Sequence, residues 1–216
     1  MCALVITLPC YASDSASAVI IDNFDRGLDP QWQVKEFNGQ THYRIVNDPS
    51  GKILEADSHG TASALVYEKR YKLRDYPFLS WRWKVSAINA KGDASHKEGD
   101  DYAARIYVVF PHWFFPMTRS INYIWANKLP IDSHIPSSYT NRSMMLAVES
   151  GSENVGSWRV ERRNVLEDYR HIFGEEPPLV GAIAVMTDTD NTKEHALSWY
   201  DDIRIESIPE HAPAKE

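Results

Sequence analysis

Short runs of β-branched and aromatic residues alternate with Gly, Pro, Asn and Asp along most of the chain. This punctuation is typical of antiparallel β proteins, in which short strands are joined by tight turns. The runs predict ten strands, at residues 19–22, 41–46, 52–57, 62–69, 78–85, 103–110, 143–149, 158–163, 180–187 and 198–206.

The spacing of apolar residues separates two kinds of strand. In residues 79–85 every odd position is apolar and every even position is polar, so this strand should have one face in the core and one in water. Residues 105–110 and 181–186 are apolar on both faces, as in central strands that are covered on both sides.

One helix is predicted between Asn164 and Gly174. Asn164 can cap its start, Glu167 stands where a capping box places an acid, and Gly174 can end it before two prolines. Its apolar positions follow helical spacing: Val165, Tyr169, Ile172 and Phe173. One short helix among ten strands predicts an all-β fold, an antiparallel β-sandwich of jelly-roll type.

The first eighteen residues differ from the rest, because an apolar run is followed by small residues and by two possible signal-peptidase sites that end in alanine, at residues 10–12 and 16–18. We interpret residues 1–18 as a secretory signal peptide that is truncated at its start, since no Lys or Arg precedes the run. Export, to the periplasm, is the expectation; a frayed cytosolic N-terminus is the alternative. Cys2 and Cys10 both fall in this segment, so the processed chain would have no disulfide.

Composition fits a single domain after that segment. The chain has 216 residues, 43% of them hydrophobic, which is enough for one well-buried core. We expect a domain at residues 19–206 and a flexible tail at 207–216. The net charge of -7 does not indicate binding to nucleic acid, whose phosphate backbone is also negative. No apolar run is long enough for a transmembrane helix. The oligomeric state is not indicated.

Acidic residues gather at the predicted strand ends. Asp100 and Asp101 open one strand, while Asp188, Asp190 and Asn191 follow another. If the two strands are antiparallel neighbours, these groups meet at one edge. Arg105, on the same strand face as Asp101, and Arg162 are expected to join them. Such a cluster suits a cation, sugar hydroxyls, or a salt-bridge network that fixes strand register.

Aromatic residues mark a second candidate, in the long segment from Pro111 to Trp125 that has no clear strand pattern. Long irregular segments are often binding loops, and indole and phenol rings stack on sugar faces. Trp113, Tyr123 and Trp125 are therefore a possible glycan platform. The alternative is an aromatic plug at one end of the sandwich, because exposed aromatics are costly without a partner.

Catalysis has less support than binding. Glycoside hydrolysis needs two carboxylates at a set separation, and Glu149 and Glu161 are the best candidates, although acids in such strands normally face solvent. No pair of histidines has zinc-ligand spacing, and no serine lies in a nucleophile elbow. A polysaccharide lyase that uses Tyr107 or His112 with Arg105 is a further alternative.

Five motifs resemble an exported bacterial family known as domain of unknown function 3047; they lie at residues 21–25, 79–84, 100–105, 168–178 and 187–192. The resemblance supports the fold and export and implies no activity. A looser likeness is to jelly-roll carbohydrate-binding modules, from which Asp25 and Asp201 would be ligands of a structural calcium ion. The alternative is that these acids shape turns.

These observations predict a β-sandwich that binds a polar ligand of the cell envelope, such as a glycan. A polysaccharide-acting enzyme and a protein-interaction module are the alternatives, and binding is favoured over catalysis.

Overall fold

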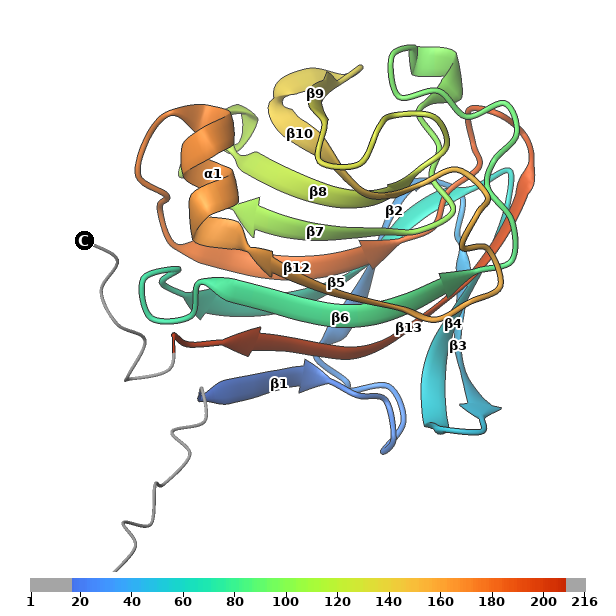
Figure 1. The fold of residues 1–216 in the computed structure, drawn as a ribbon, viewed down its shortest axis with the longest axis horizontal. Coiled ribbons are helices and arrows are strands. Elements are labelled where there is room, and N and C mark those ends of the chain that lie inside the picture. Colours follow the sequence, from blue (N-terminus) through green and yellow to red (C-terminus); the bar gives the residue numbers. More distant parts are fainter. Residues whose placement is uncertain (1–16, 209–216) are drawn as a thin grey trace, which may run out of the picture.

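The computed structural model describes residues 17–208, which form two β-sheets packed face to face (Figure 1). The prediction of an all-β sandwich with one short helix is confirmed. Apart from Ser17 and Ala18, the predicted signal peptide lies outside the described residues, as does the predicted tail beyond Ile208.

Sheet A has six strands in the order β11-β6-β13-β4-β3, with β1 added alongside β13. All of its strand pairs are antiparallel. Its strands are β1 (Ala18–Asp22), β3 (His42–Asp48), β4 (Gly51–His59), β6 (Phe78–Val85), β11 (Arg159–Asn164) and β13 (His195–Glu206).

Sheet B has seven strands in the order β2-β5-β12-β7-β8-β10-β9. They are β2 (Trp32–Asn38), β5 (Ala62–Tyr71), β7 (Arg105–Phe110), β8 (Arg119–Ala126), β9 (His134–Ser137), β10 (Thr140–Ser150) and β12 (Val180–Met186). One pair departs from the predicted antiparallel pattern, because β10 runs parallel to β8. The short strand β9 lies outside β10 and ends the sheet on that side.

The core lies between the sheets and is rich in aromatic side chains. Trp81 and Trp83 of β6 are fully buried, as their alternation predicts, and they pack against Tyr123 and Trp125 of β8 with ring centroids 5.4 and 5.9 Å apart. Burial of such large rings is a major source of stability for a sandwich of this size.

The helix α1 (Val165–Phe173) packs beside β6 and β11 at one end of the sandwich (Figure 1). The side chain of Asn164 caps it by accepting a hydrogen bond from the Glu167 backbone N–H, and Gly174 ends it in the left-handed conformation, both as predicted. Tyr169 is buried against Phe110 of β7, so the helix closes this end of the core. Two 3-10 turns, Lys97–Gly99 and Phe115–Met117, complete the structure.

Three strands were not expected from the sequence: β2, β8 and β9. The expectation of an irregular segment from Pro111 to Trp125 is wrong in its second half, because β8 begins at Arg119. Tyr123 and Trp125 point into the core and are fully buried, so neither belongs to a surface platform. Trp113 remains in the loop, where 92% of its surface is exposed.

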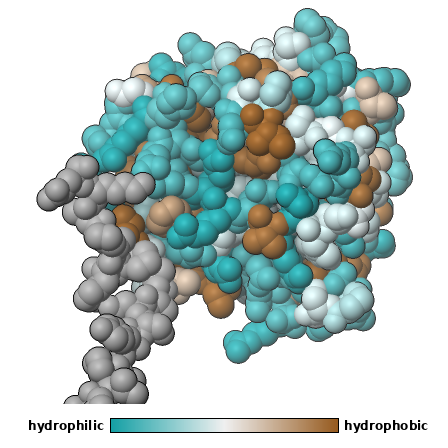
Figure 2. Space-filling view, in the orientation of Figure 1, coloured by the Kyte–Doolittle hydropathy of each residue, from teal (hydrophilic) through white to brown (hydrophobic). Residues whose placement is uncertain are grey.

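Surface apolar residues are dispersed over the face seen in Figure 2, where hydrophobic residues form small separate patches among hydrophilic ones. Scattered apolar residues of this kind are normal for a protein surface. The exposed aromatic residues of the loop after β7, Trp113, Phe114 and Phe115, are an exception because they are adjacent in sequence.

Candidate ligand-binding site

A cleft of about 370 Å³ lies on the outer face of sheet B, the face turned away from sheet A. Alternate residues of the central strands face outward here and form its floor, as the two-residue period of a strand requires. They are mostly small or flexible: Ala62 of β5, Met186 of β12, Tyr107 of β7, and Ser143 and Met145 of β10.

Two exposed aromatic residues flank the cleft. Phe37, near the end of β2, is 58% exposed, and Tyr139, in the turn between β9 and β10, is 57% exposed. The loop after β7 that carries Phe115 approaches the β2 edge of the sheet, since the Lys35 amine lies 5.4 Å from the Phe37 ring and 5.3 Å from the Phe115 ring. The cleft is therefore an open groove with aromatic surfaces at its margins.

A buried ion pair forms one end of the cleft. Arg105 begins β7 and Asp188 follows β12; these strands are antiparallel neighbours, so the two side chains meet in a direct ion pair. Burial alone would lower the pKa of Arg105, but the Asp188 carboxylate raises it above its ordinary value, so the guanidinium stays charged. The guanidinium carbon also lies 5.0 Å from the Tyr102 ring centroid.

In the segment after β12, alternate residues face the protein core and the cleft. Thr187 and Thr189 are held by the protein interior, where the Thr189 hydroxyl accepts a hydrogen bond from the Gly60 backbone N–H. Asp188 and Asp190 face the cleft instead. The oxygen-bearing residues at alternate positions therefore follow from an extended backbone that faces the core on one side and the cleft on the other.

Asp101 holds this turn in place through hydrogen bonds to its backbone. Its carboxylate accepts hydrogen bonds from the backbone N–H groups of Asn191, at 3.2 Å, and Thr192, at 2.5 Å. Burial raises the pKa of Asp101 and these donors oppose the rise. Asp101 does not line the cleft, so it acts on the site by holding the turn in place.

A polar rim continues across this end of the cleft. The Asn38 amide donates to Asp190 at 3.1 Å, and the Asn191 amide donates to the Tyr139 hydroxyl at 3.0 Å. Two buried atoms beside the rim, Oδ1 of Asp100 and Nε of Arg105, have no hydrogen-bond partner among the described residues. A polar ligand would find both donors and acceptors at this rim.

The structure brings together six of the residues singled out from sequence: Asp100, Asp101, Arg105, Asp188, Asp190 and Asn191. The carboxylates of Asp101, Asp188 and Asp190 come close enough to share a cation. However, backbone N–H groups and the Arg105 guanidinium already supply positive partners to two of these acids. The third acid, Asp190, accepts a hydrogen bond from the Asn38 amide and has no ion-pair partner among the described residues.

The expected position of Arg162 is wrong. Arg162 lies on β11 of sheet A, where it pairs with Glu206 at 2.7 Å and covers the Phe78 ring. Strand alternation predicts which residues share a face, but it does not say to which sheet a strand belongs. Arg162 thus stabilises the edge of sheet A and does not take part in the cleft.

Asp25 lies in the turn after β1, whereas Asp201 lies within β13 opposite Arg82 of β6. Asp25 accepts from the Lys52 backbone N–H at 3.2 Å, and Asp201 forms an ion pair with Arg82. Among residues 17–208, neither belongs to a group of three potential metal ligands. The structural calcium ion stays a prediction.

The cleft residues that the sequence did not single out are mainly Phe37, Asn38, Ser137, Tyr139 and Met145. Phe37 and Asn38 directly precede Gly39, and Tyr139 follows two serines, so both aromatics stand beside turn residues. An aromatic residue at a predicted turn is a signal that would have pointed to them.

Residues 30–204 match the protein family described as Protein of unknown function (DUF3047). The chain belongs to this family. The match covers both sheets of the DUF3047 domain except β1 and the last residues of β13, and it includes four of the five motifs, so the predicted resemblance is confirmed.

Solved structures with a similar fold have low sequence identity to this DUF3047 protein. The family 11 carbohydrate-binding module of a Clostridium thermocellum cellulase has 12% identity and a TM-score of 0.49, with 92% of this chain and 99% of that chain covered. The K3 adhesin domain of Lys-gingipain from Porphyromonas gingivalis has 10% identity and a TM-score of 0.48, covering 88% and 100%. No curated protein matches the sequence.

The predicted catalytic acids of the DUF3047 domain lie apart from the cleft. Glu149 is buried and pairs with Arg159 at 2.6 Å, while Glu161 accepts a hydrogen bond from the Trp83 indole at 3.3 Å. Burial, and then the neighbouring charge of Glu149, raises the pKa of Glu161 to about 7. The expectation that both acids face solvent is wrong for Glu149.

Within residues 17–208 of the DUF3047 protein, we find no helix with the length and apolar character needed to span a membrane.

Proposed function

We propose that this protein is an exported binding protein whose cleft on sheet B holds a glycan. The observation that carries the proposal is the composition of the cleft: aromatic rings at its margins, and a polar rim with both amide donors and carboxylate acceptors at one end. Sugars present the same combination, an apolar face for stacking and hydroxyls that both donate and accept hydrogen bonds.

The charge of the cleft narrows the class of glycan. Arg105 is paired with Asp188, whereas Asp100 and Asp190 add negative charge at the polar end of the cleft; Lys35 and Lys97 lie at its margins, over the rings of Phe37 and Tyr139. An acidic polysaccharide would be repelled here, because like charges brought together at a partly buried site cost free energy. A neutral glycan is therefore the proposed ligand, and export would place the protein where envelope glycans occur.

The test is isothermal titration calorimetry of the purified chain against neutral and acidic oligosaccharides. We expect neutral oligosaccharides to bind and acidic ones to bind more weakly. Replacing Tyr139 or Phe37 by alanine should weaken binding at least about fivefold, since stacking of a sugar on an aromatic ring contributes on the order of 1 kcal/mol or more.

Val160→Ala is the matched control, because Val160 is an exposed apolar residue on β11 of the other sheet. Its affinity should equal that of the unmodified chain. Equal loss of affinity in Val160→Ala and Tyr139→Ala would contradict the proposal, as would preference for acidic glycans. New reducing ends during the titration would favour the enzyme alternative instead.

A further inference from the structure

Two histidines and an aspartate meet on the outer face of sheet A, on the opposite side of the sandwich from the cleft. Asp57 and His59 lie two residues apart on β4, and His195 lies directly opposite His59 on β13. Residues two apart on one strand point to the same face of a sheet, and so does the residue paired with one of them on the next strand. The strand pairing therefore places these three side chains together.

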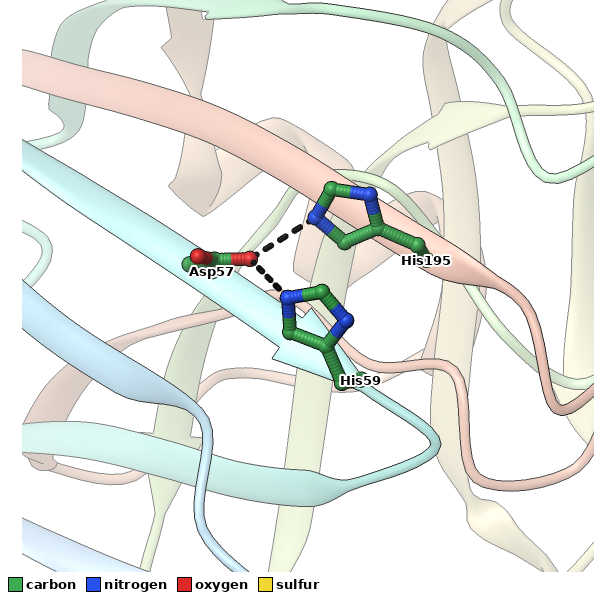
Figure 3. Close-up of side chains that lie close together, drawn as sticks. All are labelled: Asp57, His59 and His195. Carbon is green, nitrogen blue, oxygen red and sulfur yellow. Dashed lines mark hydrogen bonds and ion pairs between the residues drawn. The ribbon is translucent and has the colours of Figure 1, made fainter.

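The side chains converge on one point (Figure 3). Nε2 of His195 lies 2.8 Å and Nε2 of His59 lies 3.0 Å from the same oxygen, Oδ1 of Asp57. The two imidazole rings stack with their centroids 4.0 Å apart and their planes within 9°. Each histidine thus directs the same ring nitrogen toward the carboxylate.

We propose that Asp57, His59 and His195 form a binding site for a divalent transition-metal ion of the Zn²⁺ type. Two imidazole nitrogens and a carboxylate oxygen are a ligand set that such ions prefer, whereas Ca²⁺ and Mg²⁺ prefer oxygen ligands alone. The three ligand atoms lie within 4.8 Å of one another.

Both histidines must adjust to admit the ion. Ligand atoms about 2.0 to 2.2 Å from a tetrahedral zinc ion are separated by roughly 3.3 Å. The present separations from Asp57 to the histidines are 2.8 and 3.0 Å, so each would lengthen by a few tenths of an ångström, and the stacked rings would turn out of their parallel arrangement so that both nitrogen lone pairs point at the ion. The rings are free to do so, since the His59 and His195 side chains are 61% and 52% exposed.

The exposure also determines what the site offers. Three protein ligands leave a coordination position for water or for a donor atom of another molecule. The ion would tie β4 to β13 close to the end of their pairing, where Gly60 begins the connection to β5. Protons compete for the imidazole nitrogens, so the bound ion should be released on acidification.

The test uses the full chain without an affinity tag, stripped with EDTA and titrated with ZnCl₂ at pH 7.5. We expect one zinc ion per chain, a rise in melting temperature with zinc, and no rise with CaCl₂. CoCl₂ should give the visible absorption of a tetrahedral site. His59→Ala and His195→Ala should each weaken zinc binding at least about tenfold, and Asp57→Asn should weaken it as well.

His96→Ala is the control, because His96 is an exposed histidine in the loop between β6 and β7. Its zinc affinity should match that of the unmodified chain. The proposal is overturned if the chain shows no zinc binding up to about 1 mM. It is equally overturned if the variant with both His59 and His195 replaced binds zinc as well as the unmodified chain. Neither result bears on the cleft of sheet B.

Discussion

At the scale of single residues, the site depends on charges that the fold buries. Arg105 and Asp188 are 4% and 2% exposed, yet both are ionisable and they meet at the wall of the cleft. Burying an isolated charge is costly, so each of the two requires the other. The sequence predicted only that Arg105 joins a cluster that includes Asp188, on the condition that the strands now named β7 and β12 are neighbours.

Removing one member of this pair should therefore destabilise the protein strongly. We expect Asp188→Ala to lower the free energy of unfolding by about 3 to 5 kcal/mol, because a buried guanidinium is left unpaired. The double variant Arg105→Met with Asp188→Ala should be less destabilised than the sum of the single variants. Urea denaturation followed by tryptophan fluorescence measures both, and additive losses would contradict a direct interaction.

Glu161 gives a prediction on pH. Its pKa in the folded protein, about 7, is above the ordinary value, so the folded state holds this proton more tightly than the unfolded state. The contribution of Glu161 to stability therefore declines as the pH rises from about 4.5 to about 7.

Glu161→Gln should remove this contribution. The variant should be more stable than the unmodified chain at pH 8, and the difference should shrink toward pH 4.5. Thermal unfolding at a series of pH values measures the difference between the two proteins. A constant difference over that range would contradict a raised pKa.

At the scale of elements, local patterns predicted more than long-range ones. The alternation in residues 79–85 and the capping residues of α1 predicted β6 and the helix because both signals are contained in a few neighbouring residues. The strand β8 was missed although Ile121, Tyr123 and Trp125 alternate, since the preceding aromatic loop obscured where the alternation begins.

The parallel pair of β8 and β10 had no local signal at all. It arises because the chain passes through β9 and returns along β10 in the same direction as β8. Such a connection depends on the packing of distant segments. For the same reason Tyr139, in the turn between β9 and β10, could not be placed beside the cleft from sequence.

The cap of α1 can be tested by itself. Asn164 accepts the Glu167 backbone N–H at 3.2 Å, so Asn164→Ala should lower the free energy of unfolding by about 1 kcal/mol. Glu167→Ala is the control, because the donor is the backbone and remains; its effect should stay within about 0.5 kcal/mol. Equal losses in the two variants, measured by urea denaturation, would rule out the capping role.

At the scale of the whole molecule, the sandwich presents two unlike outer faces. The outer face of sheet B carries the cleft, with its small floor residues and aromatic margins. The outer face of sheet A carries ion pairs and the cluster of Asp57, His59 and His195. The fold class was predictable because alternating apolar and polar residues identify strands that have one buried face. The assignment of each strand to a sheet was not, as the position of Arg162 illustrates.

The central claim is that a neutral glycan occupies the cleft of sheet B. Its most direct test is an NMR titration of the ¹⁵N-labelled chain with the tightest-binding neutral oligosaccharide. The account predicts that the largest chemical-shift changes fall on Phe37, Asn38, Tyr107, Tyr139 and Asn191, while β11 and the outer face of sheet A stay unchanged. Changes centred on sheet A or on Trp113 alone, with the cleft residues unperturbed, would contradict it.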